Sequence, residues 1–176
     1  MLIITGSLAY DNIMDFPGLF SDHILAGSEH KINLSFIVNK FARRRGGTAG
    51  NASYSLGLLN TDHILFSAAG KDFGEYKSVF DKMGIDTKNI LIDKENYTST
   101  GMAITDKSDN QIWGFFSGAT EMTEKMDLKK VAKKGDLIII GPAGAKGSMS
   151  FVKQCIKLKL DYMFDPGFIL TRYGLS

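Results

Sequence analysis

The feature that most constrains the fold of this sequence is an alternation between short apolar runs and segments with helical periodicity. The runs that have the length of a buried strand are 2–5, 64–69, 137–140 and 162–164, and the segments with a helical pattern are 52–59, 73–83, 123–134 and 147–158. Continuous apolar strands that are separated by helices form parallel sheets covered on both faces. The sequence therefore predicts an α/β fold with a doubly wound, mostly parallel sheet.

Two regions do not fit this parallel sheet. Residues 32–39 alternate along the chain in a way that predicts a strand with one covered face, whereas residues 7–30 look irregular. Residues 98–106 and 111–116 are β-rich runs joined by a polar turn, which is the pattern of a hairpin. We expect these regions to form a small β-sheet inserted into the α/β core as a lid, built from segments at about 10–45 and 98–117.

Composition narrows the choice of partners and compartment. The chain has 176 residues, a length that suits one domain with a real core, and its formal net charge of +2 gives no reason to expect nucleic acid or an anionic membrane. Cys155 is the only cysteine, which excludes an intrachain disulfide and favours a reducing compartment. No apolar run approaches the length of a membrane span, and the N-terminus becomes polar too soon for a signal peptide. We expect a soluble, cytoplasmic protein.

A glycine-rich segment, residues 43–51, directly precedes one of the helical patterns. Gly46 and Gly47 let a ligand approach closely because no Cβ atom blocks it. Asn51 would then lie in the first helical turn, where backbone N–H groups are free and the helix dipole favours polar or anionic ligands. The alternative is a plain helix cap with a tight turn. The arginines of the segment, Arg43 to Arg45, are either solvated charges or residues that steer an anionic ligand.

Asp11 follows the first predicted strand and the glycine at its end. Ligands of open α/β sheets bind beyond the carboxyl ends of the strands. A carboxylate in that place can accept two hydrogen bonds from vicinal hydroxyl groups and so hold a sugar. The alternative is a turn, because aspartate and the asparagine that follows it both favour turns.

Three further patterns match known motifs only in part. In residues 141–148 Lys146 precedes Gly147, whereas a phosphate-binding loop needs Gly-Lys-Ser/Thr, and residues 46–51 fail the dinucleotide pattern G-x-G-x-x-G. Residues 72–74 spell Asp-Phe-Gly, but the other protein-kinase elements are missing. The histidines have no ligand-like spacing and Cys155 has no paired base, so we predict no metal site and no thiol nucleophile.

The predicted hairpin carries a cluster of aromatic residues. On a strand, Trp113 and Phe115 point to one side and Phe116 to the other. Such clusters usually belong to a core. On a lid, however, one side of the cluster would cover a sugar or a base and exclude water.

Several motifs occur together in a characteristic order: Gly6-Ser7 with Asp11, the run Gly46-Gly47-Thr48-Ala49-Gly50-Asn51, Gly70-x-Asp72-Phe73-Gly74, Gly84-Ile85-Asp86-Thr87, Thr100-Gly101-x-Ala103, Asn110-Gln111 and Asp165-Pro166-Gly167. In this order and spacing they resemble the N-terminal part of PfkB-type carbohydrate kinases, the ribokinase superfamily, over essentially all 176 residues. The Gly-Gly-Thr-Ala-Gly-Asn form is most similar to the adenosine-kinase-like or nucleoside-kinase-like branch.

The resemblance implies a ribokinase-like fold and transfer of phosphate from ATP, with Mg²⁺, to the primary hydroxyl of a sugar or nucleoside. It implies that Asp11 and Asn51 bind sugar hydroxyls, that Gly46 and Gly47 form a hinge against which the sugar packs, and that Ala103 lines the lid. It also allows a homodimer through the lid.

The resemblance also implies what these residues do not supply. The family's Asn-x-x-Glu and Gly-Ala-Gly-Asp motifs, the latter with the catalytic aspartate, do not occur before Ser176. We therefore expect the N-terminal part of one kinase domain that carries the substrate-binding half, with the catalytic residues beyond Ser176 and no kinase activity of its own. The alternative is a non-catalytic sugar- or nucleoside-binding module or pseudokinase fragment. Asn60 stands where the family usually has glycine at a helix end, a place that asparagine also fills.

Overall fold

The structure, a computed structural model, describes residues 1–24 and 34–167. Its central sheet has four parallel strands in the order β10-β9-β1-β4. Their bounds are β1 Leu2–Thr5, β4 His63–Leu65, β9 Leu137–Ile140 and β10 Asp161–Phe164. A shorter parallel pair, β5 (Ser67–Ala69) with β6 (Ile90–Ile92), follows β4. The predicted run 64–69 is thus divided between two sheets.

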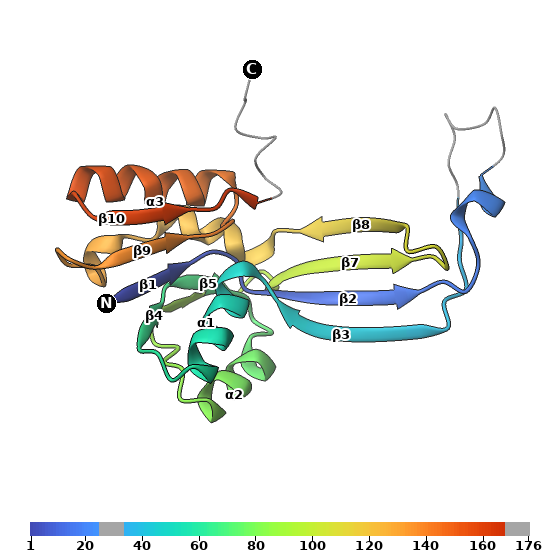
Figure 1. The fold of residues 1–176 in the computed structure, drawn as a ribbon, viewed down its shortest axis with the longest axis horizontal. Helices are drawn as coiled ribbons and strands as arrows, with labels where there is room; N and C mark the ends of the chain where they lie inside the picture. Colours follow the sequence, from blue (N-terminus) through green and yellow to red (C-terminus); the bar gives the residue numbers. More distant parts are fainter. Residues whose placement is uncertain (25–33, 168–176) are drawn as a thin grey trace, which may run out of the picture.

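Helices cover both faces of the central sheet (Figure 1). On one side lie α1 (Thr48–Leu58) and α2 (Gly74–Lys82), and on the other lies α3 (Ala145–Leu158). Consecutive strand residues point to opposite faces, so Ile3 packs in the cluster under α3 and Ile4 in the cluster under α1 and α2. The predicted doubly wound α/β core is confirmed.

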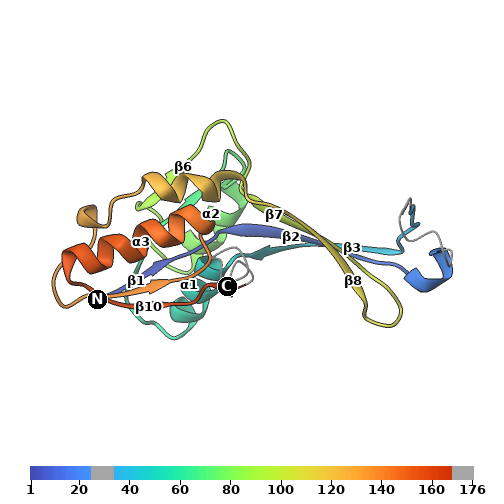
Figure 2. The same cartoon turned by 90° about the horizontal axis from the view of Figure 1, so that it is seen from above.

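A second sheet projects away from this core as a long, twisted blade (Figures 1 and 2). We call it the lid sheet, and its strand order is β3-β2-β7-β8. The bounds are β2 Ala9–Asp15, β3 Lys40–Gly46, β7 Ser99–Thr105 and β8 Gln111–Phe116. The two outer pairs are antiparallel and the central pair β2–β7 is parallel. The predicted hairpin at 98–116 is confirmed in β7 and β8.

Two sequence-based predictions in the lid region are wrong. Residues 9–15, which look irregular, form β2, and the predicted strand at 32–39 contains no strand in its described part, residues 34–39. The strand that pairs with β2 starts one residue later, where Lys40 faces Asp15. The alternation in 34–38 is still visible as alternating burial. A strand requires a hydrogen-bonded partner, and local alternation does not reveal where that partner lies.

The predicted helix at 123–134 is also wrong. The chain there makes short 3-10 turns, η2 (Gly118–Lys125) and η3 (Leu128–Lys130). The Asp127 carboxylate accepts a hydrogen bond from the Lys129 N–H at 3.0 Å and starts a new turn. Side chains of this kind compete with the helical backbone pattern. The predicted ends of two other helices are confirmed. Asn60 has a φ of +51° just after α1, and Gly84 has a φ of +71° just after α2.

The far end of the lid sheet has a small aromatic core of its own. The 3-10 turn η1 (Phe20–His23) packs Phe20 against Phe16, with ring centroids 6.0 Å apart, and Phe36 lies 4.6 Å from Phe16. Residues 1–24 and 34–167 contain no helix long and apolar enough to cross a membrane.

Candidate functional site

Asp11 lies on β2 between glycines of its two neighbouring strands. The register pairs Asp11 with Arg44 of β3 and with Gly101 of β7. A Cβ atom at Gly101 would lie 2.7 Å from Asp11 Oδ1, and one at Gly46 would collide with Oδ2. Glycine at both positions therefore creates the space that the Asp11 carboxylate occupies.

The Asp11 carboxylate has no hydrogen bond or ion pair with any residue in the described part of the chain. Burial raises the pKa of Asp11 above the usual value of a carboxyl group. Its two oxygens are acceptors with no donor among residues 1–24 and 34–167. Such a carboxylate is chemically suited to a pair of hydroxyl groups on a ligand. The alternative interpretation of Asp11 as a turn residue is wrong, because β2 runs through it.

Gly47 starts α1 in a conformation that favours glycine, with a φ of +86°. A Cβ atom there would lie 2.8 Å from the carbonyl carbon of Ser7. Ser7 also closes the helix start, because its carbonyl oxygen accepts hydrogen bonds from the N–H groups of Ala49 (3.0 Å) and Gly50 (3.3 Å). The Ser7 hydroxyl accepts one more from the Thr48 N–H at 3.2 Å. The prediction of free N–H groups at this helix start is therefore wrong.

Asn51 lies in the first turn of α1, as the sequence predicts. Its backbone N–H donates to the Gly47 carbonyl at 2.9 Å. Its exposed side chain has no hydrogen bond with the described residues. At this helix start the Asn51 amide group is exposed, whereas the first backbone N–H groups are bonded to Ser7.

Trp113 and Phe115 lie on the same face of the lid sheet as Asp11. Phe115 is paired with Gly101, which is itself paired with Asp11, and Trp113 is paired with Ala103. Ring atom Cζ3 of Trp113 would lie 2.8 Å from a Cβ atom at Gly101, so the indole covers that glycine. Trp113 is 50% exposed and Phe115 42%, so their interpretation as core residues is wrong. The predicted sidedness is confirmed, since the register puts Phe116 on the other face.

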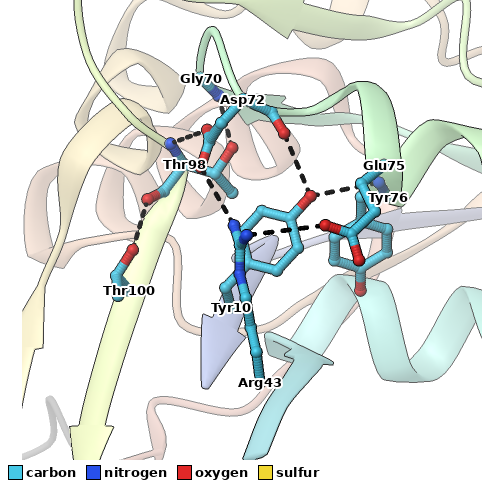
Figure 3. A network of polar contacts seen from close by, with 8 residues as sticks. All are labelled: Tyr10, Arg43, Gly70, Asp72, Glu75, Tyr76, Thr98 and Thr100. Atoms are coloured by element: carbon cyan, nitrogen blue, oxygen red, sulfur yellow. Dashed lines mark hydrogen bonds and ion pairs between the residues drawn. The ribbon is translucent and has the colours of Figure 1, made fainter. Parts of the chain in front are cut away.

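The three arginines of β3 have different surroundings. Arg44 faces the same side as Asp11, whereas Arg43 and Arg45 face the opposite side. The Arg43 guanidinium lies 4.0 Å from the centroid of the Tyr10 ring. It also lies 3.7 Å from Asp72 and 3.6 Å from Glu75, both next to the start of α2 (Figure 3).

Two buried tyrosines complete this cluster behind the site (Figure 3). The Tyr76 hydroxyl of α2 donates a hydrogen bond to the Gly46 carbonyl at 2.9 Å. The Tyr10 hydroxyl donates to the Asp72 carbonyl at 3.1 Å and accepts from the Tyr76 N–H at 3.2 Å. Burial raises the pKa of both phenols, which keeps the hydroxyl groups protonated as donors.

Asp72 belongs to the Asp-Phe-Gly triplet, which the sequence analysis does not assign to a protein kinase because the other kinase elements are missing. Here its carboxylate accepts a hydrogen bond from the Thr98 N–H at 2.8 Å, just before β7. The triplet thus connects α2 to the lid sheet. Sequence reasoning missed Tyr76 in this role, and it used Gly101 only as part of a family motif. The signal for Gly101 is its pairing with Asp11, which requires β2 to be recognised as a strand.

The remaining motifs considered in the sequence have the following surroundings. In the loop before α3 the Ser148 hydroxyl accepts from the Ala143 N–H at 2.9 Å, so the loop closes on itself. No group of three His, Cys, Asp or Glu side chains in residues 1–24 and 34–167 is placed to hold a metal ion. Cys155 is buried among apolar residues, which raises its thiol pKa to about 11.

Comparison with known proteins gives concordant matches. The model of the pfkB family carbohydrate kinases matches residues 9–169. A nucleoside kinase of Methanothermobacter thermautotrophicus is 28% identical and aligns with 99% of this chain and 54% of its own length.

Solved structures match in the same way. The nucleoside kinase of Burkholderia thailandensis in complex with inosine superposes with a TM-score of 0.80 at 34% identity, covering 94% of this chain and 52% of that one. The nucleoside kinase of Methanocaldococcus jannaschii, an archaeal member of the ribokinase family, shares the fold with a TM-score of 0.74 at 22% identity, covering 98% and 54%. The chain thus spans about half the length of these relatives.

Proposed function

The chain belongs to the pfkB family of carbohydrate kinases, and from that premise we propose that it is the substrate-binding half of an ATP-dependent kinase that phosphorylates the primary hydroxyl of a nucleoside or sugar. The observation that carries this proposal is the Asp11 carboxylate, which lies between two glycines without a protein donor among the described residues. Vicinal hydroxyl groups of a ribose supply the missing donors.

We expect the ligand to contact Asp11, Asn51 and the glycine pair Gly46 and Gly47. Asp11 accepts hydrogen bonds from two sugar hydroxyls, and the Asn51 amide adds a further polar contact from the start of α1. Gly46 and Gly47 let the sugar lie close to the backbone where the lid sheet joins the core. Because the start of α1 already donates its first N–H groups to Ser7, this end of the site is suited to hydroxyl groups rather than to phosphate.

A nucleoside fits the neighbouring surface better than a bare pentose does. Trp113 and Phe115 present half-exposed rings on the face that holds Asp11. Aromatic rings stack on planar bases and contribute about 1–3 kcal/mol per base. The curated relative and the solved structures described above are nucleoside kinases, and one of them is in complex with inosine.

ATP and Mg²⁺ belong to this proposal as requirements of kinase chemistry. ATP supplies the phosphoryl group and Mg²⁺ neutralises its developing charge. The start of α1 does not fit these groups, since Ser7 accepts from its first N–H groups, and no group of three His, Cys, Asp or Glu side chains in residues 1–24 and 34–167 is placed to hold a metal ion. Because the Asn-x-x-Glu and Gly-Ala-Gly-Asp motifs are not among these 176 residues, we assign the catalytic base and the ATP site to sequence outside them. This chain binds and orients the acceptor and excludes water from it.

Calorimetric titration of inosine, adenosine and ribose into the wild-type chain and an Asp11→Ala variant tests the proposal. We expect nucleoside affinity to fall about 100-fold in the variant, because two charge-assisted hydrogen bonds are lost. Asp15→Ala is the matched control, since Asp15 lies on the same face of β2 but pairs with Lys40 at 3.5 Å. Equal affinity in Asp11→Ala and wild type would overturn the assignment of Asp11.

A phosphoryl-transfer assay with ATP and Mg²⁺ separates the kinase half from a complete enzyme. We expect no transfer by the 176-residue chain, and robust activity would contradict the assignment of the base elsewhere. Transfer that appears only when the chain is joined to the Gly-Ala-Gly-Asp part of a relative supports the kinase. Nucleoside binding without such complementation supports a non-catalytic binding module.

A homodimer through the lid sheet is part of the same proposal. Phe41, Met102 and Phe116 are each more than half exposed, and the register puts all three on the face opposite Asp11. An exposed apolar sheet face favours association. Sedimentation of wild type against Phe116→Lys is the measurement, and a monomeric wild type at high concentration contradicts the dimer.

A further inference from the structure

The cluster behind the site joins β2 and β3 of the lid sheet to α2 of the core. We propose that Tyr76 acts as the pivot of the lid and Arg43 as an adjustable tie, so that both are positioning residues for the Asp11 site. Neither residue faces the ligand side of the sheet. The inference rests on the proposed function only for its consequence on substrate binding, since the position of the lid is measurable without any ligand.

The pivot is the hydrogen bond from the Tyr76 hydroxyl to the Gly46 carbonyl at 2.9 Å. Tyr76 is only 2% exposed, and its ring packs against Phe73 and Phe80, with ring centroids 5.8 and 4.9 Å away. A Cβ atom at Gly50 would collide with the same hydroxyl, so α1 leaves the space for it. The last residue of β3 is therefore fixed to α2 by a buried bond beside Gly47, the residue with positive φ.

The contacts of Arg43, the proposed tie, are longer and more exposed than the buried Tyr76 hydrogen bond. Arg43 is 43% exposed and lies 3.6–3.7 Å from two carboxylates, beyond ordinary hydrogen-bond distance. Its guanidinium lies over the Tyr10 ring, a contact that tolerates sliding. Because Asp72 and Glu75 share the Arg43 guanidinium, this cation stays close to at least one carboxylate over a range of lid angles. In this proposal the Arg43 contacts restrain the lid sheet without fixing it in one position.

Geometry makes Arg43 sensitive to small rotations. It lies three residues from Gly46 along β3, about 10 Å from the pivot. A rotation of about 10° moves Arg43 by about 2 Å, which is enough to form or break an ion pair. The same rotation moves the far end of β7 by about 4 Å, because that strand end is about 23 Å away.

The tie reaches Asp11 through the adjacent residue of β2. Tyr10 carries the guanidinium of Arg43 on its ring, and its hydroxyl is bound to the Asp72 carbonyl and the Tyr76 N–H. Asp11 follows Tyr10 and points to the opposite face. A change in the position of the Tyr10 side chain therefore changes the direction of the Asp11 carboxylate. Figure 3 shows this cluster joining β2, β3 and α2.

The decisive experiment measures the position of the lid by pulsed electron spin resonance between nitroxides at Ser108→Cys and Lys157→Cys. Both positions are exposed, one at the far turn of the lid sheet and one on α3, and the buried Cys155 stays unlabelled. We expect Arg43→Gln to broaden the distance distribution, and Tyr76→Phe to shift its mean by about 4 Å. Lys77→Ala is the matched control, because it breaks only the Lys77–Asp81 pair on α2.

The proposal is overturned if both Arg43→Gln and Tyr76→Phe give the same distance distribution as the wild type. The Lys77→Ala control should also match the wild type. Arg43 is partly exposed, so its variant keeps the test open even if Tyr76→Phe fails to fold. Arg43→Lys keeps the charge but not the flat stacking on Tyr10, and we expect it to restore part of the wild-type width. If the width of the distance distribution is the same in Arg43→Lys and Arg43→Gln, the proposed role of the Arg43 charge is also contradicted.

Nucleoside affinity is the second readout. We expect it to fall about fivefold in Arg43→Gln and about tenfold in Tyr76→Phe, with Lys77→Ala unchanged. If wild type binds no nucleoside, the proposed function fails while the distance measurement still decides the pivot and the tie. If the distances change and affinity does not, the cluster positions the lid but does not act on Asp11, which contradicts that step.

Discussion

Asp11 and Asp106 lie at opposite ends of the lid sheet, and their carboxylates have opposite surroundings. Asp106 accepts hydrogen bonds from the N–H groups of Phe20 (3.1 Å), Ser108 (2.9 Å) and Asn110 (2.9 Å), and from the Asn110 side chain. Burial acts to raise its pKa, but these hydrogen bonds outweigh burial and leave the pKa lowered. Asp11 is partly buried and has no donor in the described part of the chain, and burial raises its pKa.

The difference teaches how to separate a structural acid from a candidate binding acid. Both side chains are at least partly buried, so burial alone does not distinguish them. Asp106 has its acceptor capacity filled by the turn that it organises. Asp11 keeps its acceptor capacity, at a cost in stability, on a face lined by glycine and aromatic residues. Perturbed groups of the second kind are candidates for function.

The largest expected effect is on stability, at the far end of the lid sheet. Asp106→Ala leaves three buried or partly buried N–H groups without their acceptor. We expect the free energy of unfolding in urea to fall by about 3 kcal/mol. Lys107→Ala, in the same turn but exposed, serves as the control and should change it by less than about 0.5 kcal/mol. A loss below about 1 kcal/mol for Asp106→Ala would erase the contrast with Asp11.

The next effect is on binding, at the base of the lid sheet. A methyl group added by Gly101→Ala would lie 2.7 Å from Asp11 Oδ1 and 2.8 Å from the Trp113 ring. We expect nucleoside affinity by calorimetry to fall about tenfold, or about 1.4 kcal/mol. Gly114→Ala, on the neighbouring strand, adds the same methyl group where nothing lies within 4 Å. Equal affinities in the two variants would show that the space around Asp11 is not used.

Removing the charge at Asp11 should have a smaller effect, with the opposite sign to that at Asp106. Asp11→Asn relieves the desolvation of a carboxylate that has no donor in the described part of the chain. We expect its thermal unfolding midpoint to rise, by the equivalent of about 0.5 kcal/mol, while nucleoside binding weakens. A lower midpoint for Asp11→Asn would indicate that Asp11 supports the fold as Asp106 does.

The pH dependence of stability gives the finest test. Asp11 has a raised pKa in the folded state, so its contribution is full below the unfolded value of about 3.9 and is lost as pH rises through the folded pKa. The advantage of Asp11→Asn over wild type in urea unfolding should therefore grow from pH 4 upward and then level off.

Asp106 gives the mirror image, because its folded pKa is lowered. Its contribution is present above about pH 3.9 and is lost as pH falls through the folded pKa. The deficit of Asp106→Asn relative to wild type should shrink on acidification. Parallel pH profiles for the two variants would contradict the comparison.

Local pattern was sufficient for the core and insufficient for the lid sheet. The strands β1 and β9 are continuous apolar runs, so their burial is visible in the sequence itself. The strand β2 contains aspartate and asparagine, which favour turns, and pairing with β3 on one side and β7 on the other overrides that preference. The helix predicted at 123–134 is wrong for a different reason, because side-chain hydrogen bonds of Thr123 and Asp127 compete with the helical backbone pattern in this segment.

The sequence by itself determined the α/β class, the glycine-rich start of α1, the place of Asn51 in its first turn and the family. These follow from residue types at short spacing, where backbone geometry and burial act locally. Only the tertiary structure decided that Gly101, 90 positions after Asp11, lies beside its carboxylate, that Ser7 takes the first N–H groups of α1, and that Tyr76 holds the Gly46 carbonyl. Those contacts depend on the register between distant strands, and a pattern read along one segment does not contain that register.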